Sequence, residues 1–247
     1  MKHVAIIPMA GKGLRFINQG YKHPKPLIEI ENEYMFLKVC KSIPKPDKWI
    51  FIYNQLIDDK YNLEKIINNN FTNSISIKVV EDTGGQAQSC KLAYEYINDD
   101  DFVFISSCDI LNDYTVDKLE DFEKKYDIQV FTTDQNQYAI NNPEQFGWVY
   151  SEHSIVKNIT CKESLPRNIE GSTIIGSFIF SKAKYMKESI LLMEKTQNKI
   201  KNEYYIDMCL ISALKNNYTI YENRCKNFHS IGTPNELNNY LSKKKLK

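Results

Sequence analysis

Residues that could do chemistry begin within the first thirty positions of this chain. Residues 4–7, Val-Ala-Ile-Ile, predict a buried strand that leads into a loop carrying Gly11, Gly13 and Arg15. Lys25 follows shortly after, between two prolines. Glycines let the backbone approach an anion closely and direct its N–H groups inward, while the two cations add positive charge. This pattern predicts a loop that binds a polyphosphate.

Two well-known phosphate-binding loops do not fit this segment. A dinucleotide-binding loop needs a third glycine where this chain has Phe16. A Walker A loop needs Ser or Thr after its Gly-Lys pair, but Lys12 is followed by Gly13. A bare Gly-x-Gly after a strand is often an ordinary turn. The nearby Arg15 and the Pro-Lys-Pro segment favour phosphate binding over that reading.

The elements that must position this loop alternate between strand and helix in the first half of the chain. Repeated β-α-β units predict a parallel sheet with helices on both faces. Ligands of such sheets bind beyond the carboxyl ends of the strands, and Gly11, Gly85 and Asp109 all follow predicted strands. The predicted strands cover residues 4–7, 49–53, 75–80 and 102–106, and the predicted helices cover residues 34–43, 61–69 and 86–97.

The second half of the chain has a mixed pattern of strands and helices. We find no internal repeat and no linker rich in Gly, Ser or Pro that would divide the chain. The sequence therefore predicts one α/β domain over residues 1–247. The predicted strands cover residues 130–132, 148–150, 155–159 and 173–180, and the predicted helices cover residues 184–195, 203–214 and 234–241.

The composition of the chain limits which molecules it can be expected to bind. The 32 basic and 31 acidic residues give a formal net charge of +1, which offers no electrostatic basis for binding nucleic acid or a membrane surface. Because the first residues lead directly into a predicted strand, we expect no signal peptide, and no apolar run is long enough to span a bilayer. Its six cysteines include no Cys-x-x-Cys pair. These features predict a cytoplasmic protein without disulfides or a zinc site.

Residues 10–16, Ala-Gly-Lys-Gly-Leu-Arg-Phe, and residues 24–27, Pro-Lys-Pro-Leu, resemble the signature of the sugar-phosphate nucleotidyltransferases, or NDP-sugar pyrophosphorylases. The resemblance extends from Val4 to about residues 231–234. It implies a Rossmann-like nucleotide-diphosphate-sugar-transferase fold, with a mixed, mainly parallel central sheet flanked by helices. It also implies a Mg²⁺-dependent enzyme in which a substrate phosphate oxygen attacks the α-phosphorus of a nucleoside triphosphate and pyrophosphate leaves.

The resemblance assigns roles on the nucleotide side of such a site. A phosphate nucleophile is already ionised at neutral pH, so the protein has to align two anions and neutralise charge. Arg15 would hold the leaving pyrophosphate, Lys25 would reach the α-phosphate, and Asp109 would bind Mg²⁺. A lone carboxylate after a strand is otherwise often a helix N-cap. The residues expected to contact the nucleotide are Ala10, Gly11, Gly13, Glu81, Gly85 and Gln86.

The second metal ligand is less obvious. Relatives of the thymidylyltransferase type carry an aspartate just before a late Gly-Thr pair, but residues 230–233 of this chain read Ser-Ile-Gly-Thr. Glu203 and Asp207 are four residues apart on a predicted helix and would share one face. Asp207 is therefore the substitute candidate. The alternative is a helix N-terminus that is simply enriched in acidic residues.

The acceptor side departs from the family pattern. Lys162 resembles the lysine of a Glu-Lys-Pro segment that holds the incoming phosphate, and the matching position of the glutamate, which takes sugar hydroxyls, is Cys161. Gly147, Gly176 and Glu203 match positions that line the acceptor pocket. A thiol is a poor partner for hydroxyls, so the sequence favours a small, non-sugar phosphate such as a phosphorylated amine or amino acid.

These residues predict transfer of a nucleotide from CTP to a small phosphorylated acceptor, in the synthesis of surface polysaccharide or capsule precursors. CTP is favoured because Glu81 can accept from the amino group of cytosine. One alternative is a UTP- or dTTP-dependent hexose-1-phosphate pyrophosphorylase. A GT-A-type glycosyltransferase needs an Asp-x-Asp motif, whereas residues 108–111 read Cys-Asp-Ile-Leu. A third alternative is a non-catalytic nucleotide-binding regulator, against which the intact Arg15, Lys25, Asp109 and Lys162 argue. The sequence leaves open whether the protein forms a homo-oligomer.

Overall fold

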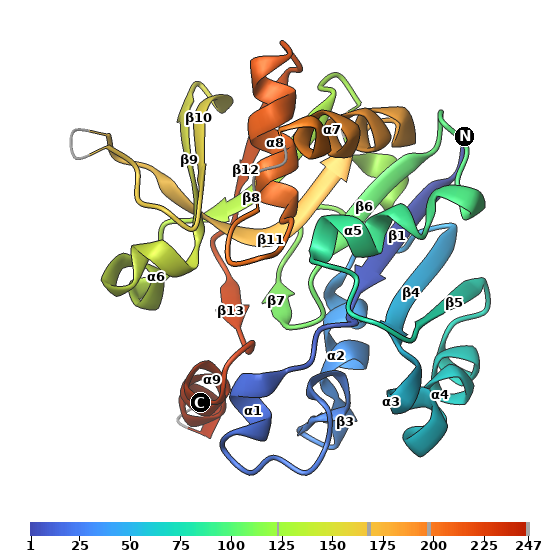
Figure 1. Cartoon of the computed structure of the whole chain (residues 1–247). Coiled ribbons are helices and arrows are strands. Elements are labelled where there is room, and N and C mark those ends of the chain that lie inside the picture. The colour runs from blue at the N-terminus through green and yellow to red at the C-terminus, as the bar shows by residue number, and fades with distance from the viewer. Residues whose placement is uncertain (123, 167–168, 197–198, 246–247) are drawn as a thin grey trace.

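The computed structural model describes residues 1–122, 124–166, 169–196 and 199–245. A nine-stranded sheet runs through this part of the chain in the order β5-β4-β1-β6-β11-β8-β12-β10-β9, with helices on both faces (Figure 1). Its strands are β1 (His3–Pro8), β4 (Lys48–Asn54), β5 (Ser74–Val79), β6 (Phe102–Ser106), β8 (Ile128–Thr133), β9 (Gly147–Glu152), β10 (Ile155–Cys161), β11 (Ser172–Phe180) and β12 (Ile220–Arg224).

The first half of the sheet is parallel. Strands β5, β4, β1 and β6 pair side by side in the same direction, as the repeated β-α-β pattern predicts. Successive residues of β1 are buried on opposite faces: Val4 and Ile6 pack toward α5, and Ala5 and Ile7 pack toward α2. Burial on both faces explains the continuous apolar run. The helices of this half are α2 (Met35–Ser42), α3 (Gln55–Tyr61), α4 (Leu63–Asn70) and α5 (Gln86–Lys91).

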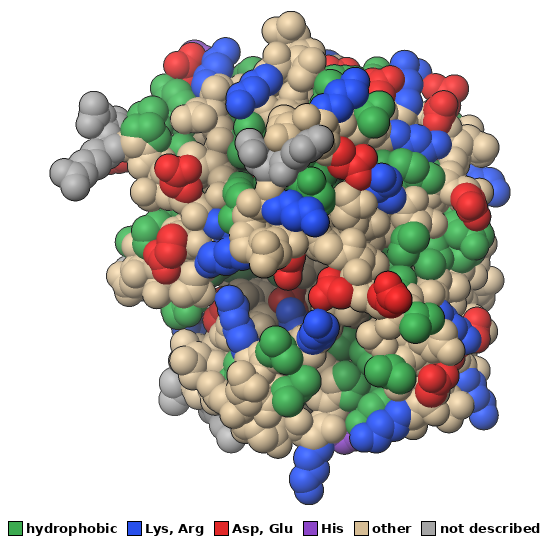
Figure 2. Space-filling view, in the orientation of Figure 1, with side chains coloured by type: hydrophobic (Ala, Val, Ile, Leu, Met, Phe, Trp, Pro, Cys, Tyr) green, Lys and Arg blue, Asp and Glu red, His purple; other side chains and the backbone are tan. Residues whose placement is uncertain are grey.

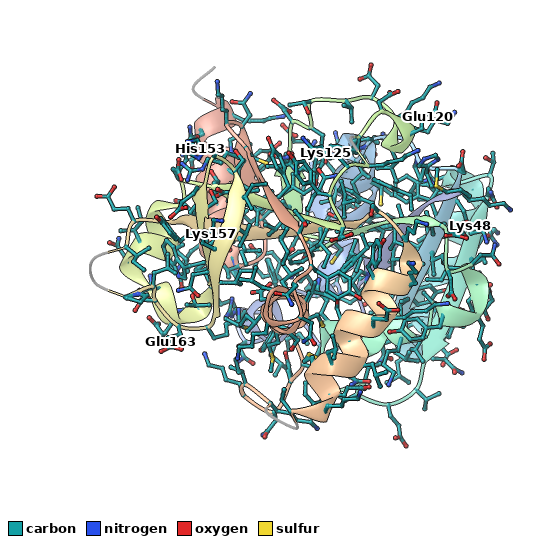
Figure 3. The ribbon with its side chains drawn as sticks, turned by 90° about the horizontal axis from the view of Figure 1, so that it is seen from above. Lys48, Glu120, Lys125, His153, Lys157 and Glu163 are labelled. Carbon is teal, nitrogen blue, oxygen red and sulfur yellow. The ribbon has the colours of Figure 1, made fainter. Side chains whose placement is uncertain are left out.

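The second half of the sheet is mostly antiparallel and closes on itself. Strand β11 pairs antiparallel with β6, β8 and β9, while β12 pairs parallel with β8 and antiparallel with β10. Because β9 also pairs with β10, the strands β11, β8, β12, β10 and β9 form a closed ring. The sheet is therefore mixed, as expected, with its parallel strands concentrated in the first half. Figure 3 places His153 and Lys157 of the β9–β10 hairpin opposite Lys48 of β4.

Glu222 on β12 points into this ring. Its fully buried carboxylate accepts from Thr132 Oγ1 at 2.7 Å and from the hydroxyls of Ser151 and Ser172, and Arg224 Nε lies 3.3 Å away. Burial alone would raise the pKa of Glu222, but these donors outweigh it and hold the pKa below its usual value. Strand β12 was not predicted from the sequence, because the charged Glu222 in its middle gives this buried strand the pattern of an exposed polar segment.

We expect Glu222→Ala to lower the free energy of unfolding by about 3 kcal/mol, because three hydroxyls from three strands lose their acceptor inside the ring. Urea unfolding followed by circular dichroism would measure the change. Glu152→Ala removes an exposed carboxylate from the neighbouring hairpin and serves as the matched control. Equal midpoints for the two variants would show that the Glu222 network contributes nothing to stability.

Two predicted helices differ from the structure. The expected helix over residues 86–97 ends at Lys91 and is followed by a 3₁₀ turn, Tyr94–Tyr96. The expected helix over residues 203–214 begins only at Ile206 as α8 (Ile206–Lys215). The reason is that the backbone of Tyr204 bonds to the β5–α5 loop: its N–H donates to Gly84 O at 2.9 Å, and its carbonyl accepts from Ala87 N at 3.0 Å. Those bonds replace the first turn of a helix.

Within the described part of the chain, none of the helices has the length and apolar character of a membrane span. Helix α7 (Ala183–Lys195) packs against α8 on one face of the sheet. The remaining helices are α1 (Leu14–Ile17), α6 (Gln137–Asn141), α7 (Ala183–Lys195) and α9 (Pro234–Lys245); the strands are β2 (Glu29–Ile30), β3 (Glu33–Tyr34), β7 (Ile110–Asn112) and β13 (Phe228–Ser230); further 3₁₀ turns are Lys25–Leu27, Leu119–Asp121 and Pro143–Gln145.

Candidate active site

The loops that carry the predicted site residues gather at the carboxyl ends of the parallel strands. Gly11 follows β1, Gly85 follows β5 and Asp109 follows β6, and these three strands run in the same direction. Figure 2 shows a hollow near the centre of this face, with lysine, arginine and acidic side chains around it. The expectation that these residues share one edge of the sheet is confirmed.

The two parts of the N-terminal signature pack against each other. Gly13 has φ +63° and precedes α1, and a Cβ at this position would stand 3.0 Å from Lys25 Cβ. Phe16 on α1 is fully buried, and its ring meets the ring of Tyr21 edge-on at 5.0 Å. This apolar anchor holds the loop while Arg15 stays exposed on the same short helix. A backbone with positive φ and close packing on Lys25 together explain the glycine.

Lys25 and Asp109 form an ion pair. Lys25 Nζ donates to Asp109 Oδ2, and the hydroxyl of Ser107 donates to Oδ1. The two charged side chains are only 22% and 15% exposed. Burial by itself would lower the pKa of Lys25 and raise that of Asp109, but their mutual attraction reverses both shifts. The pair is therefore fully ionised at neutral pH.

Two glycines, Gly176 and Gly232, pack closely against Asp109 and its chain neighbours. Gly176 has φ +85° at an irregularity of β11, and its carbonyl accepts from Ser107 N at 3.1 Å. A Cβ on Gly232 would clash with Asp109 Oδ2, and Ile231 N donates to Asp109 O at 3.0 Å. The late segment thus lies beside Asp109, and at the position where thymidylyltransferase-type relatives carry an aspartate, Ile231 has a fully buried apolar side chain.

The loop between β5 and α5 lies across from the glycine loop that follows β1, and an ion pair joins the two loops. Gly85 has φ +123°, and a Cβ there would stand 2.5 Å from the backbone of Tyr204, so only glycine fits. Lys12 Nζ lies 3.3 Å from Asp82 Oδ2, and both side chains are mostly exposed. This pair bridges the glycine loop after β1 and the loop after β5. Glu81 is exposed and Gln86 is partly exposed at the start of α5.

A second group of residues surrounds Asp207 on α8. Gly147 on β9 pairs with Cys161 on β10, and a Cβ on Gly147 would clash with Asp207 Oδ2. Burial raises the pKa of Asp207 to about 6, and the nearby Lys162 opposes part of that rise. Burial and the charge of Asp207 raise the pKa of Cys161, which keeps its thiol neutral. Lys162 Nζ donates to Gln145 O and stands 4.9 Å from the centre of the Tyr205 ring.

The prediction that Glu203 and Asp207 share one face of a helix is wrong, because Glu203 lies before the start of α8. Glu203 is exposed, pairs through its backbone with Ile200 and is hydrogen-bonded to the side chain of Tyr205. Tyr204 and Tyr205 were missed as site residues, because the sequence pattern placed both inside a helix. The only sequence signal for them is a pair of aromatic residues between two acids.

Asp109 and Asp207 belong to different halves of the site. The ion-pair and side-chain hydrogen-bond partners of Asp109 are Lys25 and Ser107, whereas the charge that acts on the pKa of Asp207 is that of Lys162. Within the described residues, no group of three His, Cys, Asp or Glu side chains is arranged to hold a metal ion. A role for Asp207 as second metal ligand stays a prediction.

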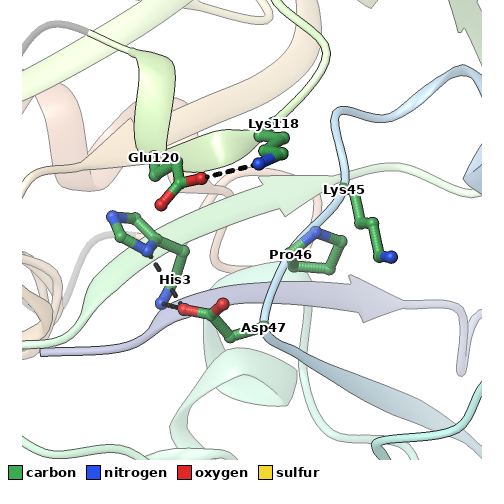
Figure 4. Close-up of a pocket in the computed structure, with 6 residues that line it drawn as sticks. All are labelled: His3, Lys45, Pro46, Asp47, Lys118 and Glu120. Carbon is green, nitrogen blue, oxygen red and sulfur yellow. Dashed lines mark hydrogen bonds and ion pairs between the residues drawn. The ribbon is translucent and has the colours of Figure 1, made fainter.

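A cavity of about 180 Å³ lies elsewhere, at the amino ends of β1 and β4 (Figure 4). His3 Nδ1 lies 3.1 Å from Asp47 Oδ2, and Lys118 Nζ lies 3.1 Å from Glu120 Oε1. Because the parallel strands carry the signature loops at their opposite ends, this cavity is separate from the site around Lys25 and Asp109.

Comparisons with known proteins agree with this geometry. A nucleoside-diphosphate-sugar pyrophosphorylase from Vibrio cholerae RC9 superposes with a TM-score of 0.77 at 16% identity, covering 96% of this chain and 99% of that one. An inositol-1-phosphate CTP transferase from T. maritima gives 0.76 at 16% identity, covering 98% and 94%. A putative glucose-1-phosphate thymidylyltransferase from Bacillus anthracis gives 0.70 at 16% identity, covering 97% and 94%.

At such identities these likenesses establish the fold, which is the Rossmann-like fold that the sequence resemblance implied. No curated protein sequence matches the chain. The family model described as "Nucleotidyl transferase" matches residues 4–241, which is nearly the whole chain and includes every candidate site residue. The chain therefore belongs to the nucleotidyl transferase family.

Proposed function

We propose that this protein is a Mg²⁺-dependent nucleotidyltransferase that moves a nucleotide, preferably from CTP, onto a small phosphorylated acceptor and releases pyrophosphate. The observation that carries the proposal is a site with two charged centres. Lys25 and Asp109 stand beside the glycine loop, and Lys162 and Asp207 stand beside the β9–β10 hairpin. Each centre has a cation for one of the two phosphate groups that must meet.

On the nucleotide side, the backbone of residues 11–13 would bind the triphosphate through its N–H groups. Lys25 would move onto the α-phosphate, where charge builds up during transfer, and Arg15 would hold the departing pyrophosphate. No residue has to act as a general base, because the attacking phosphate is already ionised. The role of the protein is to align the two phosphates and to neutralise their charge.

Asp109 suits a metal ion that arrives with its own oxygen ligands. It offers one carboxylate, beside the Ser107 hydroxyl, and no second acidic side chain contacts it in the described residues. Mg²⁺ is usually bound by one or two carboxylates together with water and substrate phosphates, so this donor set fits. Bound there, magnesium would neutralise charge on the phosphates.

On the acceptor side, Lys162 would hold the phosphate of the acceptor. With a pKa of about 6, Asp207 is mostly ionised at pH 7 and would attract a positively charged group. Tyr205 adds an aromatic face that already meets the ammonium of Lys162. The neutral thiol of Cys161 offers little to sugar hydroxyls. These features favour a phosphorylated amine, whose activated product is the kind of precursor that surface polysaccharide synthesis consumes.

The base preference rests on Glu81 and on one comparison. The exposed carboxylate of Glu81 can accept from the amino group of cytosine. The T. maritima relative is named for CTP and for a phosphate other than a hexose phosphate, which supports the same pairing on this fold. A UTP- or dTTP-dependent hexose-1-phosphate pyrophosphorylase is the second candidate, since the B. anthracis relative is named as a glucose-1-phosphate thymidylyltransferase.

A rate comparison tests this substrate assignment. CTP, UTP, GTP, ATP and dTTP are each paired with phosphocholine, phosphoethanolamine, phosphoserine and glucose-1-phosphate, and pyrophosphate release is measured. We expect the largest kcat/KM for CTP with a phosphorylated amine. Efficient turnover of glucose-1-phosphate with UTP or dTTP, and none of CTP with any amine, would replace the proposal by the second candidate.

Variants at the two charged centres should separate the two substrates. Arg15→Ala is expected to lower kcat by about 10²-fold, because Arg15 meets charge that grows in the transition state. Lys162→Ala is expected to raise the KM of the acceptor at least about tenfold and to leave triphosphate affinity nearly unchanged. Steady-state kinetics and calorimetric titration would measure both. Lys162→Ala losing the triphosphate while keeping the acceptor would reverse the two assignments.

A further inference from the structure

Lys25 occupies the position that a metal ion would need at Asp109. Its ammonium donates to Oδ2, the Ser107 hydroxyl donates to Oδ1, and Gly232 presses so closely on Oδ2 that a Cβ there would clash. The backbone of Gly13 also packs closely on Lys25, since a Cβ at Gly13 would stand 3.0 Å from Lys25 Cβ. Both carboxylate oxygens are therefore engaged by the chain's own donors.

Opening this pair without a replacement would be costly. The side chains of Lys25 and Asp109 are 22% and 15% exposed, so water and salt screen their attraction only weakly. A divalent cation arriving alone would repel the ammonium and leave Lys25 largely withdrawn from water without a counter-ion. A polyphosphate removes this obstacle, because it supplies new anionic partners for Lys25 and for the nearby Arg15.

We propose that Lys25 serves as the resident cation of Asp109, which keeps a divalent ion from binding there until a triphosphate draws Lys25 away. Lys25 thereby couples the two binding events: the carboxylate opens to metal only when the phosphates have taken its ammonium. This inference rests on the proposed metal role of Asp109 and adds the residue that excludes the metal beforehand.

Binding of Mn²⁺ alone, without nucleotide or acceptor, tests this coupling. The bound fraction follows from the loss of the free-ion signal in electron paramagnetic resonance. We expect Lys25→Met, which keeps the length of the side chain but removes its charge, to bind Mn²⁺ at least tenfold more tightly than the wild type. Adding Asp109→Asn to that variant should abolish the gain. Lys187→Met, which removes the same charge from the ion pair with Asp99 before the amino end of β6, should bind like the wild type.

Equal Mn²⁺ affinity of wild type and Lys25→Met, or a gain that survives Asp109→Asn, would overturn the proposal. A second measurement needs only the wild type: Mg²⁺ alone should leave its melting temperature unchanged, and a rise of several degrees with Mg²⁺ alone would also overturn it. Neither readout depends on turnover. Failure to turn over any triphosphate would count against the proposed function and not against this exclusion.

Discussion

Asp109→Ala is expected to lower kcat by at least about 10³-fold while the protein stays folded. Asp109 is the carboxylate paired with Lys25, and no second acidic side chain of the described residues contacts it there. A loss of about 4 kcal/mol of transition-state stabilisation corresponds to such a factor. The residue lies beyond the end of β6 and not in its apolar core, so circular dichroism should show a folded protein. Pyrophosphate release measures the rate.

Asp113→Ala is the matched control, since Asp113 is exposed a few residues further along the chain and its carboxylate accepts a hydrogen bond from Asn227 Nδ2 at 2.9 Å. Its kcat should stay close to that of the wild type. Near-normal kcat in Asp109→Ala, with Mg²⁺ still required, would mean that the metal binds elsewhere. In that case Asp207 would be the next residue to examine.

Asp207→Asn is expected to stabilise the protein and to damage acceptor binding at the same time. The amide has the shape of the carboxylate, but it carries no charge into the space between Gly147 and Cys161. At pH 7 the folded wild type has to ionise a group whose pKa burial has raised to about 6. Relieving that cost should add about 1–3 kcal/mol to the free energy of unfolding.

The pH dependence follows from the direction of this shift. A carboxyl group with a raised pKa in the folded state binds more protons there than in the unfolded chain, so the contribution of Asp207 to the free energy of unfolding should fall as pH rises from about 4 to about 6. The difference between wild type and Asp207→Asn should therefore vanish near pH 4. Urea unfolding across this range measures it. A variant less stable than the wild type at pH 7 would contradict the raised pKa.

The acceptor side of the same variant gives an independent result. If Asp207 attracts a positively charged acceptor, its KM should rise about tenfold or more in Asp207→Asn, and the KM of the wild type should rise as pH falls below about 6. Triphosphate affinity should not follow either change. An unchanged acceptor KM would remove Asp207 from the acceptor pocket, whatever its effect on stability.

The parallel half of the fold and the position of its loops could be predicted because the evidence is local. An apolar run of four residues and a glycine pair predict the strand and the loop at residues 4–15 within a short stretch. The same holds for Asp109 after its buried strand. Once the strands are parallel, their carboxyl ends have to share one edge.

The closed ring and the Asp207 pocket could not be predicted because they depend on contacts between distant segments. Glu222 is buried only because Thr132, Ser151 and Ser172 reach it from three other strands. Tyr204 is not helical, because its backbone N–H donates a hydrogen bond to the carbonyl of Gly84 in the β5–α5 loop. Neither partner is visible in the local pattern, so tertiary contacts overrode the local preference in both cases.

The most direct test of nucleotidyl transfer by this protein is to follow the phosphorus products of the wild type by ³¹P nuclear magnetic resonance. The protein is incubated with Mg²⁺, CTP and a phosphorylated amine, and each component is omitted in turn. We expect pyrophosphate together with a diphosphate-linked product, formed only when all components are present. Release of inorganic phosphate, or no product with any of the five triphosphates and any phosphorylated acceptor, would contradict it.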